Sequence, residues 1–142
     1  MAANDASLDL LIDLIARAKR AGADAADALY AEGVSVSHSQ RLGKTEKLER
    51  AEGRDLGLRV FIGKRQAIVA SSDQSPKALA GLIERAVAMA KAVPEDPFCG
   101  LADPDMLARD FPALDLADPN EPAPETLIAH AKAAEEAALA VK

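Results

Sequence analysis

The sequence predicts an α+β fold, in which an antiparallel meander of three to four strands is packed by an N-terminal helix and by a helix after the sheet. Two patterns carry this prediction. Apolar residues alternate along 56–62 and again along 66–71 around a turn at Gly63, which indicates a β-hairpin. Apolar residues also recur at helical spacing before and after the strands. A proline-rich segment and the beginning of a third helix complete the predicted fold.

Size and charge limit the classes of function. A chain of 142 residues is one ordinary domain, and its 17 Lys+Arg against 23 Asp+Glu give a net charge of −6. This charge repels a phosphate backbone, so we expect no direct nucleic-acid partner. No basic segment precedes an apolar one at the N-terminus and no run of about twenty apolar residues occurs, so we expect a cytoplasmic protein without a membrane partner.

The first helix is predicted over residues 7–20. Ser7 is the expected N-cap, and Gly22 the expected left-handed stop. The apolar residues at helical spacing, which we expect to face the core, are Leu8, Leu11, Ile12, Ile15 and Ala18.

The next stretch is predicted to supply the first strands. Residues 24–32 fit a helix because of their alanines or a buried strand because they follow a capped helix, and we favour the strand. Gly33 is expected to separate it from a second strand over 34–39, where Val34 and Val36 alternate with serines. The charged stretch 40–53 is either a long twisted strand that leaves the sheet or a hairpin arm.

The centre of the chain gives the clearest pattern. Leu56, Leu58, Val60 and Ile62 are expected to face the core, and Ile68 is expected to continue that face on the returning strand, with Ala70. Ser75 and Pro76 predict a helix start, because a hydroxyl cap precedes a ring that is already set to helical φ. The apolar stripe of that helix comprises Leu79, Leu82, Ile83, Ala86, Val87 and Ala90.

The last third of the chain begins with a proline-rich segment, residues 93–124. We expect an extended surface loop with a short helical turn near 105–109, and a binding role is the alternative. A third helix is predicted from residue 125, and its pattern reaches Lys142 without a stop signal, so we expect a longer protein of which this is the N-terminal piece. The expected organisation of domain 1–142 is a core over 1–92, a wrapping segment over 93–124 and a helix over 125–142.

Residues that carry chemistry are sparse. His38 and His130 lack metal-ligand spacing, and the single cysteine, Cys99, has no visible activating partner and cannot pair in a disulfide. We therefore assign no catalytic, cofactor-binding or metal-binding residue. The scattered acidic residues Glu49, Glu52, Asp55 and Asp73 are interpreted as solvated.

Arg59 lies on the less apolar face of the central strand. The favoured interpretation is that its stem packs over the sheet while the guanidinium reaches water. The alternative is that it meets a carboxylate on a partner protein.

Several motifs together resemble the N-terminal domain of the PmbA/TldD family, and within it the PmbA (TldE) branch. They cover nearly the whole chain and fall in the expected order. They are Val34-Ser35-Val36-Ser37, Gly57-Leu58-Arg59-Val60, Ala70-Ser71-Ser72-Asp73 with Ser75-Pro76, Asp96-Pro97, Gly100-Leu101-Ala102-Asp103 and Asp115-Leu116.

The resemblance implies a role in a heteromeric TldD/TldE metallopeptidase that trims peptides, including microcin precursors and an unstructured antitoxin. It places the zinc motif, a His-Glu pair with a further histidine, in the C-terminal domain of the TldD-type partner. Here His38 is followed by Ser39 and His130 by Ala131, so no ligand carries over, and zinc is expected only in the partner.

Three hypotheses for function follow. The first is a non-catalytic wall of the peptidase, in which sheet edges near 34–39 or 66–71 and the proline-rich segment dock a TldD-like subunit and admit unfolded peptide. The second is a protein-binding module that modulates DNA gyrase without proteolysis, as the historical family name suggests. The third and weakest is a cysteine hydrolase that uses Cys99. A homo-oligomer of the isolated domain remains open.

Overall fold

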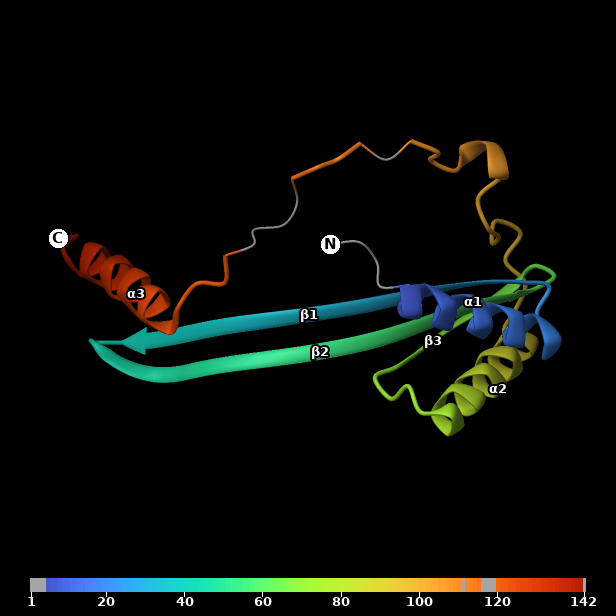
Figure 1. Cartoon of the computed structure of the whole chain (residues 1–142), viewed down its shortest axis with the longest axis horizontal. Helices are drawn as coiled ribbons and strands as arrows, with labels where there is room; N and C mark the ends of the chain where they lie inside the picture. The colour runs from blue at the N-terminus through green and yellow to red at the C-terminus, as the bar shows by residue number, and fades with distance from the viewer. Residues whose placement is uncertain (1–4, 111, 116–119, 142) are drawn as a thin grey trace. The chain divides into compact units, whose positions relative to one another are not determined.

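The computed structural model describes residues 5–110, 112–115 and 120–141 (Figure 1). Its elements are α1 (Asp5–Arg20), β1 (Ala25–Arg41), β2 (Lys44–Ile62), β3 (Arg65–Ser71), α2 (Pro76–Ala92), the 3-10 helix η1 (Pro104–Met106) and α3 (Pro124–Leu139). The strands form one three-stranded sheet in the order β1-β2-β3, and β2 pairs antiparallel with β3. The predicted α+β meander is therefore confirmed.

Contacts divide the chain into two units. The first comprises 5–32 and 53–107, and the second comprises 33–52 with the described part of 108–141. Both β1 and β2 pass from one unit into the other. No helix among the described residues combines the length and the apolar character that a membrane crossing requires.

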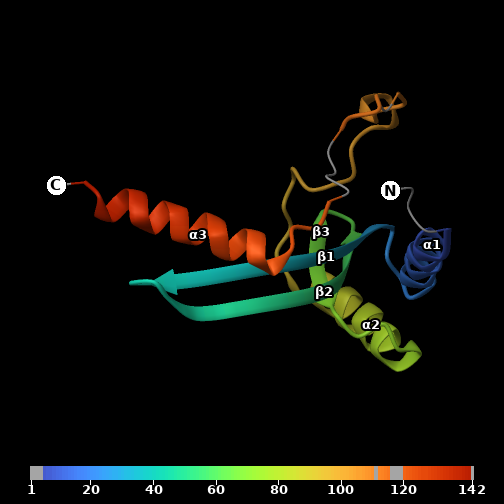
Figure 2. The ribbon, with the colours of Figure 1, turned by 60° about the vertical axis from the view of Figure 1, so that its left-hand side comes forward.

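The core of the first unit lies between the sheet and the two helices α1 and α2 (Figure 2). Leu56, Leu58 and Val60 of β2 are fully buried, as predicted. The six apolar residues predicted for α2 are all buried, and Leu82, Ala86 and Ala90 among them are completely inaccessible.

The start of α2 confirms the predicted cap. The Oγ atom of Ser75 accepts a hydrogen bond from the backbone N–H of Ala78 at 3.3 Å, and Pro76 is the first helical residue. The carboxylate of Asp73 accepts the N–H of Ser75 at 2.8 Å, and this bond lowers the pKa of Asp73. The local sequence thus fixes where the helix begins.

Two predictions for α1 were wrong. The helix begins at Asp5, so Ser7 lies inside the first turn and is not its cap. Leu14 is fully buried with Ala18, whereas Leu8 and Ile12 are 46% and 65% exposed. Helical spacing defines a stripe only approximately, and the packing of α1 on α2 selects which edge of the stripe is buried. Gly22 has φ 109 and ends the helix as predicted.

The strands also differ from the prediction. Gly33 lies within β1 and does not divide it, which is why the sheet has three strands. On β3, Ala67 is buried, whereas Ile68 is 63% exposed and Ala70 is exposed, so the predicted orientation of Ile68 and Ala70 was wrong. The reason is register: Ile62 pairs with Arg65 and Arg59 with Ile68, and residues directly opposite each other share a face.

The proline-rich segment begins against the β2–β3 turn. The N–H of Asp96 donates to the carbonyl of Lys64 at 2.7 Å, and Lys64 Nζ donates to the carbonyl of Cys99 at 3.5 Å. The expected short helical turn near 105–109 is present as η1, which is three residues long and begins one residue earlier, at Pro104. Residues 111 and 116–119, and Lys142 at the end of the predicted third helix, lie outside the described residues.

The regular elements of the second unit are a hairpin arm, residues 33–52, and the C-terminal helix α3. The charged stretch 40–53 belongs to a hairpin, as one of the two interpretations proposed, because β1 and β2 are joined by a turn at Leu42 and Gly43, with φ 49 and 73. Half-buried positions alternate on β1 at Val36, His38 and Gln40. They recur on α3 at Leu127, Ile128, Ala131 and Glu135.

Glu135 joins these two faces. Its carboxylate accepts hydrogen bonds from Gln40 Nε2 at 2.7 Å, from the backbone N–H of Gly43 at 2.8 Å and from the backbone N–H of Leu42. The bond from Gln40, followed by that from Gly43, lowers the pKa of Glu135. The helix therefore holds the turn of the hairpin through one side chain.

Candidate protein-interaction surface

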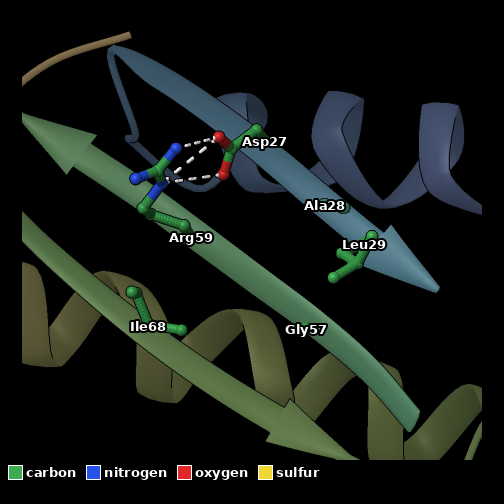
Figure 3. A pocket seen from close by; sticks show the side chains of 6 residues that line it. All are labelled: Asp27, Ala28, Leu29, Gly57, Arg59 and Ile68. Atoms are coloured by element: carbon green, nitrogen blue, oxygen red, sulfur yellow. Dashed lines mark hydrogen bonds and ion pairs between the residues drawn. The ribbon is translucent and has the colours of Figure 1, made fainter. Parts of the chain in front are cut away.

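The most distinctive surface of the first unit is the face of the sheet that the helices leave uncovered, here called the open face. It carries a shallow depression of 430 Å³. Figure 3 shows that β1, β2 and β3 all contribute to it, with the helices behind the sheet. Its lining residues are Asp27, Ala28, Leu29, Gly57, Arg59 and Ile68.

An ion pair between neighbouring strands lies at the centre of the open face. Arg59 Nε on β2 donates to Asp27 Oδ1 at 3.0 Å and Oδ2 at 3.2 Å on β1, and Arg59 Nη2 donates to Asp27 Oδ2 (Figure 3). The bond to Asp27 raises the pKa of Arg59 above its ordinary value. Arg59 thus pairs with a carboxylate of its own chain, a partner that neither sequence-based interpretation considered, while its side chain remains 37% exposed, as the favoured interpretation expects.

Phe61 also contacts the guanidinium of Arg59. The Cζ atom of Arg59 lies 5.1 Å from the centroid of the Phe61 ring, within the range of a cation–π contact. Phe61 is only 3% exposed and yet lies outside the main hydrophobic cluster. Arg59 is therefore fixed by two contacts, so its position on the open face is defined before any partner binds.

Large apolar side chains flank the ion pair. Leu29 is 70% exposed and Ile68 is 63% exposed, and Figure 3 shows both on the same side of the sheet as Asp27 and Arg59. Gly57 lies between them and carries no side chain, which makes the surface hollow. Large apolar side chains that lie exposed together on one face are typical of a surface that contacts another protein.

The other residues considered in the sequence are dispersed. His38 is half-buried on β1, and neither of its ring nitrogens has a hydrogen-bond partner among the described residues. His130 is exposed on α3, and Cys99 is a buried free thiol. Glu49 pairs with Lys47 and Glu52 with Arg50, while Asp55 is exposed. Within residues 5–110, 112–115 and 120–141, no three histidine, cysteine or acidic side chains gather where a metal ion could bind.

The sequence analysis did not identify the roles of two polar residues, Asp27 and Glu135. Asp27 lies in the stretch 24–32, where helix and strand were both considered. In a strand, neighbouring side chains point to opposite faces, so Asp27 lies on the face opposite to Ala26 and Ala28, which is the face of Arg59. That alternation was a usable signal. Glu135 gives no such signal, because its partners lie more than ninety residues away in the sequence.

This α+β domain, with its meander and open face, belongs to a known class. Residues 26–90 match the family model described as PmbA/TldA metallopeptidase domain 1. Two curated bacterial proteins match over 116 and 100 residues of this chain. The chain therefore belongs to the PmbA/TldD family through this first domain.

The curated relatives are proteins of the PmbA branch. The metalloprotease PmbA of Escherichia coli O157:H7 is 36% identical over 116 residues, which are 82% of this chain and 26% of that protein. A metalloprotease PmbA homolog of Haemophilus influenzae is 38% identical over 100 residues, which are 70% of this chain and 22% of that protein. The chain thus spans about a quarter of the length of these relatives.

Two solved structures share the fold. A Bacteroides thetaiotaomicron protein named as a candidate modulator of DNA gyrase superposes with a TM-score of 0.85 at 24% identity, over 98% of this chain and 32% of that chain. TldE from Thermococcus kodakarensis gives a TM-score of 0.69 at 22% identity, over 90% of this chain and 29% of that chain.

Proposed function

We propose that this domain is the non-catalytic first domain of a PmbA/TldE-type subunit in a cytoplasmic TldD/TldE metallopeptidase complex. Its task there is to dock the TldD-type subunit and to shape the access of unfolded peptide substrates, such as microcin precursors, during proteolysis. The match to domain 1 and the relatives named metalloprotease PmbA support this proposal. In this proposal zinc belongs to the TldD-type partner subunit, as the resemblance to the family implies.

The observation that carries the proposal is the open face. Leu29, further along β1, and Ile68, opposite Arg59 on β3, expose apolar surface next to the Asp27–Arg59 pair. Covering that surface with a partner removes apolar area from water, and the paired charges can be covered at a smaller cost than lone ones. The face is also built on strands, which hold it in a fixed geometry.

The sheet edges provide a second kind of contact. In the order β1-β2-β3, the outer strands β1 and β3 each leave one edge without a partner strand among the described residues. Such an edge pairs with an extended chain through backbone groups and excludes a folded one. This selectivity agrees with a subunit that admits unfolded peptides to a peptidase.

Substitution on the open face tests docking in the complex of the PmbA-type subunit with its TldD-type partner. Ile68→Glu and Leu29→Glu are expected to weaken co-purification of the subunits and peptide cleavage together. Ile12→Glu, on an equally exposed residue of α1, is the matched control and is expected to change neither. Unchanged assembly and cleavage in the open-face variants, or in a subunit that lacks residues 1–142, would contradict the proposal.

A second candidate function is modulation of DNA gyrase without proteolysis. The name of the Bacteroides thetaiotaomicron relative, whose fold this chain shares, favours it. The domain would then bind gyrase or one of its inhibitors as a protein-binding module. Immobilised chain is expected to retain purified gyrase from solution, and retention no higher than on a bare resin would dismiss this alternative.

A further inference from the structure

The outer edge of β2 is paired with β3 along only part of its length. The ladder between the two strands stops at the pair Leu56 and Ser71, whereas β2 continues back to Lys44. Among the described residues, no backbone hydrogen bond from outside the hairpin reaches residues 44–55. The part of this edge that belongs to the second unit, residues 44–52, is exposed at every position. We call residues 44–52 the free edge.

The sequence of the free edge is complementary to itself when read backwards. If Leu48 is placed opposite Leu48 of an antiparallel copy, each charged residue meets the opposite charge. The resulting cross-strand pairs are Lys44 with Glu52, Glu46 with Arg50, and Lys47 with Glu49. Each pair occurs twice by symmetry, and cross-strand pairs of opposite charge stabilise a sheet.

Two-fold symmetry restricts the registers that can compete. In an antiparallel pair, hydrogen-bonded and non-hydrogen-bonded positions alternate along the strands. A two-fold axis midway between two neighbouring positions would make these two kinds of position equivalent, which they are not. The axis must therefore lie between one residue and the same residue of the copy. Moving the axis to Lys47 or Glu49 places that residue opposite the same charge in the copy. The Glu49 register also places Glu46 opposite Glu52. The register centred on Leu48 avoids every such repulsion.

We propose that the free edge is a homodimerisation site, at which residues 44–52 pair antiparallel with the same residues of a second copy of this chain. Leu48, which is 51% exposed, then meets its own copy at the two-fold axis. Four of these charged residues are exposed and already pair within the chain: Lys47 with Glu49 at 2.7 Å, and Arg50 with Glu52 at 3.0 Å and with Glu121. These surface ion pairs can exchange partners when the second copy binds. Nine residues of strand pairing form a small interface, and the dimer is weak and depends on concentration.

Charge reversal within the free edge tests the register. Sedimentation velocity of the chain from about 5 to 500 µM is expected to show a dimer that weakens at high salt. Glu46→Arg places arginine opposite Arg50, and Arg50→Glu places glutamate opposite Glu46. Each single change is expected to weaken the dimer roughly tenfold, because symmetry makes two pairs repulsive. The double variant restores opposite charges at the same positions and is expected to recover the dimer.

Controls separate the register from charge and folding. Glu84→Arg on α2 changes the net charge by the same amount as Glu46→Arg at an exposed position of the first unit, and it is expected to leave the dimer unchanged. Circular dichroism reports whether each variant retains its strands. A chain that stays monomeric at all these concentrations, or a double variant no better than the single ones, would overturn the proposal.

Cross-linking at the axis gives an independent measurement. In a Cys99→Ala background, Leu48→Cys is expected to form an intermolecular disulfide in mild oxidant, because opposite residues of an antiparallel pair have Cα atoms about 4.5–5.5 Å apart. Leu42→Cys, at the more exposed tip of the arm, is the matched control and is expected to cross-link far more slowly. Equal rates at the two positions would count against the Leu48 axis.

Discussion

Arg59 on β2 and Asp27 on β1 form a bidentate ion pair across neighbouring strands, thirty-two residues apart in the sequence. The side chains are 37% and 41% exposed, so water screens the pair and its contribution to stability is small. Its main effect is geometric, because it fixes two polar side chains next to the exposed Leu29 and Ile68.

Loss of this pair is therefore expected to affect binding more than folding. Asp27→Asn and Arg59→Gln should each lower the free energy of unfolding by no more than about 1 kcal/mol, as for other exposed pairs. A double-mutant cycle in urea measures the coupling between them. Arg54→Gln, which removes the more exposed pair with Glu32, is the control. A coupling of several kcal/mol would show that the pair behaves as a buried one.

Leu58 and Ile68 should respond very differently to truncation. Leu58 is fully buried between sheet and helices, so Leu58→Ala is expected to cost roughly 2–5 kcal/mol from lost burial and the cavity left behind. Ile68 is 63% exposed on the opposite face, so Ile68→Ala should change stability by less than about 1 kcal/mol. Chemical denaturation measures both, and similar losses would contradict the orientation of β3.

The tip of the hairpin arm contains a residue in an unfavourable conformation. Leu42 has φ 49, a left-handed value that asparagine adopts more easily than leucine, and its side chain is 70% exposed. Leu42→Asn is expected to stabilise the arm by about 0.5–1 kcal/mol. Gly43→Ala, at φ 73, should destabilise it. Hydrogen exchange of the arm amides measures both changes, and faster exchange in Leu42→Asn would refute the prediction.

The contact between Glu135 and the turn should depend on pH. Its pKa is lowered in the folded protein, so the ionised carboxylate stabilises the contact above the ordinary glutamate pKa of about 4.3. This stabilisation is lost as the pH falls below that value and through the lowered pKa. The amide resonance of Gly43, followed by NMR, is expected to shift over this acidic range.

Two variants test the assignment of that titration. Glu135→Gln should abolish the acidic transition at Gly43 because it removes the titrating group. Glu136→Gln, at a neighbouring exposed residue that pairs with Lys132, should leave it in place. A transition that persists in Glu135→Gln would mean that another group titrates at the turn.

The sequence by itself determined the features that depend on neighbouring residues. Alternation along 56–62, the Ser75–Pro76 start and six-residue apolar stripe of α2, and the stop at Gly22 all follow from local geometry and hydrogen bonding, and the structure confirms them. The resemblance to the PmbA/TldD family also rested on local motifs, and the family match over 26–90 agrees with it.

Only the tertiary structure decided which distant residues meet. Strand register places Ile68 opposite Arg59 on the open face, and the packing of α1 buries Leu14 in place of Ile12. Asp27 finds Arg59, and Glu135 finds the turn at Leu42, through contacts between segments far apart in the chain. Periodicity specifies that a residue lies on a face, but the partner on that face depends on how the elements pair and pack, which no local pattern contains.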